Sequence, residues 1–210
     1  MGQKNILMIQ NQQKIFNATS HSVEIAAKAI LSNQVIIYPT DTLYSFGADA
    51  TNNKALSELN KLKQRNSPLS ILLSNINDIK KYGILNENII KKMDSLLPGP
   101  YTILLKSKNN TKISPIVQSG SDKIGIRIIK NEFCNQLIDL VKRPIITTSV
   151  NKHGQPSLYD IDEIKQEFKN HYIFHDKKKL ISKGSTIIDF SVLPEKIIRH
   201  GEGKYIHEIL

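Results

Sequence analysis

The chain has 210 residues, a formal net charge of +10 at neutral pH and one cysteine. This length suits one large domain, and a single cysteine excludes both an intramolecular disulfide and a cysteine metal cluster. No apolar run is long enough to cross a bilayer, and the first residues do not form a signal peptide. We therefore expect a cytoplasmic protein with no membrane partner.

The basic excess has two explanations. It can serve a polyanionic partner, either a nucleic acid or a small phosphorylated molecule, or it can reflect the Lys- and Asn-rich composition of an A/T-rich genome. Position is more informative than the total. The lysine run 177–179 is typical of a solvated turn. Four other cations lie beside motifs: Lys63, Arg65, Arg127 and Arg199.

Helix and strand signals alternate along the chain. In chain order, the expected elements are a helix at 23–30, a strand at 35–39, a helix from 53 to 62, a strand at 67–74, a helix at 86–97, strands at 101–106 and 123–129, a helix at 133–141, a strand at 144–149, a helix at 160–168, and strands at 185–190 and 196–200. Helices between strands imply a layered α/β sheet, and the lone strands favour a mixed sheet. We expect one domain over residues 1–210, with its core at about 19–203.

In open α/β sheets, ligands bind beyond the carboxyl ends of the strands, and polar clusters follow several of the predicted strands. In YPTDTLYSFG, Thr40 and Thr42 flank Asp41 directly after a buried strand, and Gly47 permits a tight turn. The alternative is an ordinary strand-to-helix turn in which Asp41 caps the helix.

Lys63 and Arg65 lie at the C-terminal end of a predicted helix. Cations there offset the helix dipole, which is one explanation of the pair. The other is a phosphate clamp, in which lysine acts as a point charge and arginine as a bidentate fork.

Arg127 ends an otherwise apolar strand, and a guanidinium beside the centre of a sheet needs an anion. Either a protein carboxylate or a ligand can supply it. The stretch IITTSVNKHGQPS (145–157) carries a strand into hydroxyls and an amide, which indicates either a surface loop or a ligand site. The stretches GSTIID and IIRHG add Ser185 and Arg199.

Several familiar motifs are missing from the sequence. There is no GxxxxGK[ST], GxGxxG or GxSxG motif, and no histidine pair has metal-binding spacing. Two common phosphate cradles, serine hydrolase chemistry and zinc chemistry are therefore not expected.

Seven stretches, taken in order, resemble the YrdC/TsaC family of threonylcarbamoyl-adenylate synthases: YPTDTLYSFGADA, KQRNSPLS, LPGPYTILL, IGIRI, TTSVNKHGQPS, GSTIIDF and IIRHG. The resemblance implies an α/β fold with a twisted, open, mixed sheet flanked by helices, in the short, single-domain form. It also implies a reaction, in which ATP, L-threonine and bicarbonate give threonylcarbamoyl-AMP and pyrophosphate. Other proteins use this adenylate to modify tRNA.

The resemblance also implies site residues. The threonine-binding positions are Thr40, Thr42, Arg127, Thr147 and Ser185. The ATP-binding positions are Lys63, Arg65, Ser149, Asn151, Ser157 and Arg199. Lys63 and Arg65 would stabilise charge, and no side-chain nucleophile is expected. Mg²⁺ would arrive with ATP, without protein side-chain ligands, and no organic cofactor is implied.

Four short stretches depart from the family pattern, and two of these departures concern the expected nucleotide contacts. The loop from Lys63 to Leu69 is shorter than usual and lacks a lysine before Pro68, which removes one expected phosphate contact. Val150 replaces a smaller alanine and adds bulk beside the adenylate.

Two other functions remain as alternatives. The charge would suit a structured-RNA binding module without synthase activity, although aromatic residues are sparse; weak tRNA contact is also compatible with synthesis. A carbamoyl-transfer domain of hydrogenase maturation proteins has a similar fold, but those chains are longer and carry zinc-binding cysteines.

Overall fold

The computed structural model describes residues 14–176 and 181–205, so the lysine run 177–179 lies outside the described residues. The strands form one sheet in the order β1-β8-β2-β3-β7-β4-β6-β5-β9-β10. Their bounds are β1 Ile15–Asn17, β2 Ile36–Pro39, β3 Tyr44–Gly47, β4 Ser70–Leu72, β5 Tyr101–Lys106, β6 Lys123–Arg127, β7 Ile145–Ser149, β8 Tyr172–His175, β9 Thr186–Asp189 and β10 Lys196–Arg199.

The helices are α1 Val23–Leu31, α2 Asn53–Lys63, the 3₁₀ helix η2 Ile76–Lys81, α3 Glu87–Leu96, α4 Pro115–Gln118, α5 Glu132–Val141 and α6 Ile161–Glu167. Asparagine side chains cap the first turns of three of them, because Asn52, Asn86 and Asn131 accept hydrogen bonds from backbone N–H groups three residues on. Within the described ranges, no helix is both long and apolar enough to span a membrane.

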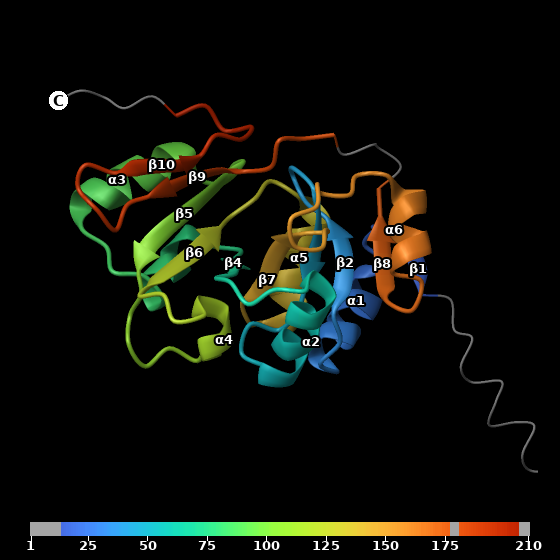
Figure 1. Ribbon diagram of the computed structural model, residues 1–210. Helices are drawn as coiled ribbons and strands as arrows, with labels where there is room; N and C mark the ends of the chain where they lie inside the picture. Colours follow the sequence, from blue (N-terminus) through green and yellow to red (C-terminus); the bar gives the residue numbers. More distant parts are fainter. Residues whose placement is uncertain (1–13, 177–180, 206–210) are drawn as a thin grey trace, which may run out of the picture.

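The sheet is mixed and twisted, as the sequence predicted (Figure 1). Strand β8 runs parallel to β1 and β2, and the pairs β4–β6 and β5–β9 are also parallel. The pairs β2–β3, β3–β7, β4–β7, β5–β6 and β9–β10 are antiparallel. In each antiparallel pair, the start of one strand therefore lies beside the end of its neighbour.

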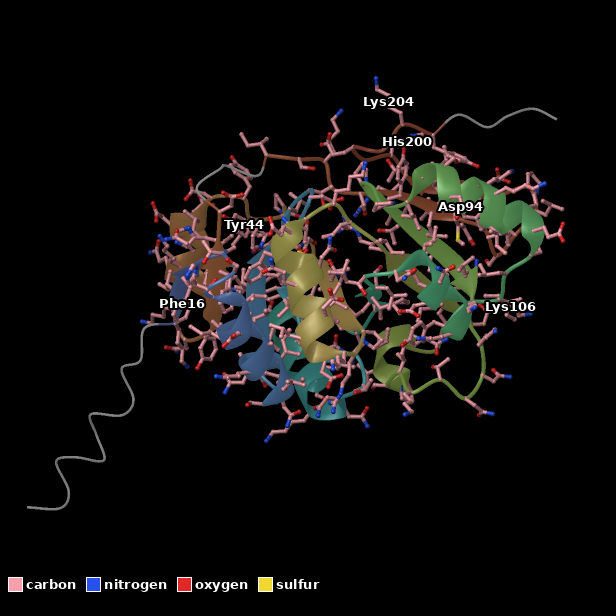
Figure 2. All side chains as sticks on the ribbon, turned by 180° about the vertical axis from the view of Figure 1, so that it is seen from behind. Phe16, Tyr44, Asp94, Lys106, His200 and Lys204 are labelled. Carbon is pink, nitrogen blue, oxygen red and sulfur yellow. The ribbon has the colours of Figure 1, made fainter. Side chains whose placement is uncertain are left out.

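Helices α1 and α5 pack side by side on one face of the sheet (Figure 2). Their apolar stripes bury Ala26, Ile30 and Leu137 against strand residues that include Leu72 and Ile145. A second core cluster brings Leu56 and Leu59 of α2 together with Phe46, Ile71 and Ile126. Since side chains alternate along strands, Ile71 and Leu72 point to opposite faces, so these helices cover opposite sides of the sheet.

The segment after β2 differs from its simplest interpretation. It does not lead into a helix; it turns back as the antiparallel hairpin β2–β3, with Tyr38 opposite Ser45. Gly47 ends β3 and does not make the turn. A Cβ atom there would lie 2.6 Å from Cε1 of Tyr38, so glycine leaves room for the tyrosine ring.

Several short elements were not predicted: β1, β3, β8, η2 and α4. Each has three to six residues, which is too short for a clear hydrophobic period. The predicted strand at 67–74 is limited to β4, Ser70–Leu72.

Candidate active site

A cavity of about 310 Å³ lies over the middle of the sheet. Its walls come from widely separated segments, and hydroxyl groups dominate the lining. The lining residues are Thr42, Leu43, Ser45, Arg65, Pro68, Ser70, Thr102, Arg127, Thr147, Thr148, Ser149, Asn151, Ser157, Gly184, Ser185, Ile187 and Arg199.

The strand register explains why hydroxyls gather on β3, β7 and β4. Ser45 of β3 lies opposite Ser149 of β7, and Thr147 lies opposite Ser70 of β4. Residues that face each other, or that lie two apart on a strand, point to the same side of a sheet. These four hydroxyls therefore form a polar stripe on one face.

The stripe continues onto the remaining central strands. Ser70 lies opposite Gly125, and Arg127 is two residues further along β6. Beyond β6 in the strand order, Thr102 of β5 lies opposite Ile187 of β9. Ile187 in turn lies opposite Arg199 of β10. One part of this face of the sheet is thus covered by α1 and α5 through apolar contacts. The part that these helices leave uncovered is polar.

This geometry corrects one expectation from the sequence. The cavity does not lie only beyond the carboxyl ends of strands, because Ser70 begins β4, Thr102 lies near the start of β5 and Ser185 directly precedes β9. Antiparallel neighbours bring starts and ends together, so the site occupies a face of the sheet and not a single edge.

Nine of the eleven side chains that the sequence singled out line this cavity. The exceptions are Thr40 and Lys63. The Thr40 hydroxyl donates to the backbone oxygen of Leu43 (2.7 Å) and accepts from the backbone N–H groups of Thr42 and Leu43 (both 3.2 Å). Thr40 therefore holds the turn that presents Thr42 to the cavity.

Lys63 is the last residue of α2, and only 1% of its surface is exposed. Its Nζ atom donates to the backbone oxygens of Ser149 (2.5 Å) and Asn151 (3.3 Å) and to Asn151 Oδ1 (2.9 Å). Lys63 thus contacts the cavity wall from outside, whereas Arg65, two residues on, lies in the cavity itself.

Arg127 already has an anion within the protein. Its Nη2 atom donates to Asp41 Oδ1 at 2.5 Å, and the two side chains are 7% and 11% exposed. Burial raises the pKa of the Asp41 carboxyl, although the charge of Arg127 opposes this rise. Among the described residues, Arg127 Nε and Asp41 Oδ2 are buried without a hydrogen-bond partner. The guanidinium therefore keeps donor capacity for a second anion.

Arg199 is held at the opposite wall. Its Nε and Nη2 atoms donate to the backbone oxygen of Ser185 (3.1 and 2.8 Å), and Nη2 also reaches the Ser185 hydroxyl (3.1 Å). That hydroxyl lies 2.7 Å from Thr102 Oγ1. Burial lowers the pKa of Arg199, and the charge of Arg127 lowers it further, which means that the two guanidiniums repel each other across the cavity.

The charged side chains that line the site are all cationic, although Asp41 beside it pairs with Arg127. Three arginines line it, and the described lining residues include no carboxylate. A partly enclosed, positive cavity attracts polyanions and strengthens its contacts with them. Arg65 also borders a more open cavity of about 870 Å³ beside α2 and α4, so this phosphate-binding candidate lines two cavities.

Sequence reasoning missed three hydroxyl-bearing residues of the cavity: Ser45, Ser70 and Thr102. Each is a single polar residue in or beside an apolar run. Strand pairing orients all three toward the cavity, and only an aligned strand register would have revealed them.

Comparison with known proteins identifies the family of this chain. Residues 28–201 match the Sua5/YciO/YrdC family model, which is described as "Telomere recombination". A Methanocaldococcus jannaschii protein with the provisional name threonylcarbamoyl-AMP synthase is 40% identical over 185 residues, which are 86% of this chain and 85% of that protein. A Pyrococcus abyssi threonylcarbamoyl-AMP synthase is 27% identical, and the match covers 85% of this chain but 54% of that protein.

The fold is also found among solved structures. The structure of Pyrococcus abyssi Sua5 complexed with L-threonine matches with a TM-score of 0.82 and 25% identity, over 90% of this chain and 58% of that one. The family model covers most of the sequence and includes all eleven predicted site residues. This chain belongs to the Sua5/YciO/YrdC family.

Proposed function

We propose that this chain is an L-threonylcarbamoyladenylate synthase, a nucleotidyltransferase that makes threonylcarbamoyl-AMP and pyrophosphate from ATP, L-threonine and bicarbonate. The observation that carries the proposal is the single positive cavity, into which separate segments deliver three arginines and a stripe of hydroxyls. The 40% identical relative with the synthase name supports it and favours synthesis over the RNA-binding alternative.

The amino acid fits the half of the cavity around Arg127. The carboxylate of threonine would accept hydrogen bonds from the guanidinium of Arg127, which lines the cavity. Thr42 and Thr147 supply hydroxyls on the same wall, and Ser185, which is hydrogen-bonded to Arg199, supplies another from the opposite wall. Asp41 would keep the guanidinium oriented while the substrate binds.

The nucleotide fits the other half of the cavity. Arg65 and Arg199 offer planar donors to phosphate oxygens, and Ser149, Asn151 and Ser157 offer hydroxyl and amide groups. Mg²⁺ would enter as part of the nucleotide substrate, bound mainly by phosphate and water. The donors of the cavity, which are hydroxyls, an amide and guanidiniums, fit a Mg·ATP complex better than a protein-bound metal.

The chemistry follows from this arrangement. The threonine amine and bicarbonate form a carbamate and water, and a carbamate oxygen then attacks the α-phosphorus while the bond to pyrophosphate breaks. Negative charge builds up on the phosphoryl oxygens and the leaving group, where fixed guanidiniums stabilise it. Holding the reactants together removes part of the entropic barrier, up to about 7–11 kcal/mol, so no side-chain nucleophile is needed.

The product would pass to tRNA-modification proteins that transfer the threonylcarbamoyl group, with weak tRNA contact as an accessory property. We propose that this reaction takes place in the cytoplasm. The direct test incubates pure protein with Mg²⁺, ATP and bicarbonate and measures pyrophosphate. Release should depend on L-threonine, and threonylcarbamoyl-AMP should be found by mass spectrometry. Equal release without threonine would contradict the proposal.

A further inference from the structure

We propose that Lys63 is a positioning residue, which holds the turn from Ser149 to Asn151 in the geometry that binds the nucleotide and does not itself contact phosphate. This inference rests on the proposed function, since it assigns a role within the ATP half of the same cavity. It concerns the one cation of the Lys-x-Arg pair that lies outside the cavity lining.

The contacts of Lys63 all point to this turn. Three oxygens surround Nζ: two backbone oxygens, from Ser149 and Asn151, and the side-chain oxygen of Asn151. The backbone oxygen of Lys63 accepts a hydrogen bond from the His153 N–H group (2.9 Å). Lys63 therefore joins the end of α2 to the chain beyond β7 at both its main chain and its side chain.

The same turn carries nucleotide-binding candidates. Asn151 Oδ1 accepts from both Lys63 Nζ (2.9 Å) and the Ser149 hydroxyl (2.7 Å). Asn151 Nδ2 donates to the backbone oxygens of Lys152 (3.2 Å) and Gln155 (2.8 Å). With its oxygen fixed by two donors, the amide has one orientation, and the Ser149 hydroxyl is placed relative to it.

The donor count of Lys63 matches its surroundings. In its ammonium form, the Lys63 side chain has three protons and no acceptor, and three oxygen acceptors lie within reach of Nζ. The Phe46 ring, with its centroid 5.6 Å from Nζ, lies beside the remaining part of the group. A side chain with 1% exposure and these partners would have to give up hydrogen bonds before it could reach a phosphate.

The test is a double-mutant cycle on nucleotide affinity, because such a cycle isolates the coupling between two residues. Calorimetry would measure the binding of Mg·ATP and of AMP to wild type, Lys63→Met, Asn151→Ala and the double variant. A second cycle, with Arg65→Met in place of Lys63→Met, is the matched control. Arg65 is two residues away in the chain but lines the cavity itself. Thermal melting would confirm that each variant is folded.

If Lys63 acts through Asn151, Lys63→Met should weaken binding of both ligands roughly 10- to 100-fold, the equivalent of a hydrogen bond to a charged group. The double variant should then bind about as weakly as the weaker single variant. The losses from Arg65→Met and Asn151→Ala should instead multiply. Multiplying losses for Lys63 and Asn151, or a lower melting temperature with unchanged affinity, would overturn the inference.

If Lys63→Met fails to fold, a second variant can still test the positioning role. Lys63→Arg retains the charge but replaces a compact ammonium with a larger, planar group. A phosphate contact would tolerate this change, whereas the buried three-oxygen arrangement would not. Lys63→Arg should therefore lose nucleotide affinity, and wild-type affinity in this variant would refute the positioning role. Absence of ATP binding to wild type would instead refute the proposed function.

Discussion

Replacing Arg127 with methionine should separate the structural role of this residue from its role in binding. The side chains of Arg127 and Asp41 are 7% and 11% exposed and form a hydrogen-bonded ion pair. Removing one member of a buried pair leaves an uncompensated charge and typically costs about 3–5 kcal/mol. Arg127→Met should therefore lower the free energy of unfolding at pH 7 by about this amount.

A second change should restore most of this loss without restoring binding. In Arg127→Met/Asp41→Asn the stranded carboxylate is gone, so the remaining cost should be that of unsatisfied polar groups, about 1–3 kcal/mol. Threonine affinity should stay low in both variants by about 1.5–3 kcal/mol, the value of a charged hydrogen bond. ATP affinity should change little.

Urea unfolding and calorimetric titration with threonine and ATP would measure these effects. Lower pH offers an internal check: protonated Asp41 needs no counter-ion, so the stability gap between wild type and Arg127→Met should narrow toward pH 4. Recovery of threonine affinity in the double variant would refute the reasoning, because Arg127 would then serve only to neutralise Asp41.

Three further predictions concern other groups. Burial and the charge of Arg65 lower the pKa of Lys63 from 10.5 to about 7. The native state then binds fewer protons than the unfolded state between these pH values, so wild-type stability should rise with pH relative to Lys63→Met, by about 1.4 kcal/mol per unit. Urea unfolding at pH 7.5 and 9 would measure this, and equal slopes would show that the ammonium keeps its proton. In Gly125→Ala, the new Cβ would lie 2.6 Å from Ser70 Oγ, and this clash should lower the free energy of unfolding by about 1–3 kcal/mol. Adding Ser70→Ala should restore most of the lost stability in melting experiments. If stability does not recover, the clash is not with Ser70. Although burial opposes the shift, hydrogen bonds from Lys92 and a tyrosine hydroxyl lower the pKa of Glu195 to about 2. The stabilisation by the ionised Glu195 carboxylate is present above pH 4.5 and is lost toward pH 2. The difference in unfolding free energy between wild type and Glu195→Gln should therefore shrink over that range. A constant difference in acid unfolding curves would contradict the lowered pKa of Glu195.

The helices and central strands could be read from the sequence because local chemistry specifies them. Asn52 and Asn86 cap helices where the sequence placed helix starts, and the apolar stripe of α5 matches its buried residues. Hydroxyls at the end of β7 and an arginine at the end of β6 were also visible locally, and all of them line the cavity.

Other features depended on partners distant in the chain. Asp41 could have been a helix cap, a ligand group or an ion-pair member, and contact with Arg127, 86 residues away, decides for the ion pair. Lys63 looked like one half of a phosphate clamp, but the Ser149–Asn151 turn takes up its three protons. Charged side chains on long stems have many partners within reach, and sequence spacing does not choose among them.

The order of polar and apolar residues by itself determined that this chain forms an α/β sheet with a basic, hydroxyl-rich site, because secondary structure and hydrophobic burial follow short-range periodicity. Tertiary structure alone decided that Ser45, Ser70 and Thr102 belong to that site, and that it lies across a face of the sheet. The reason is strand register: with a side-chain period of two, pairing between distant strands determines which residues share a face, and a shift of one residue would bury these hydroxyls on the other side.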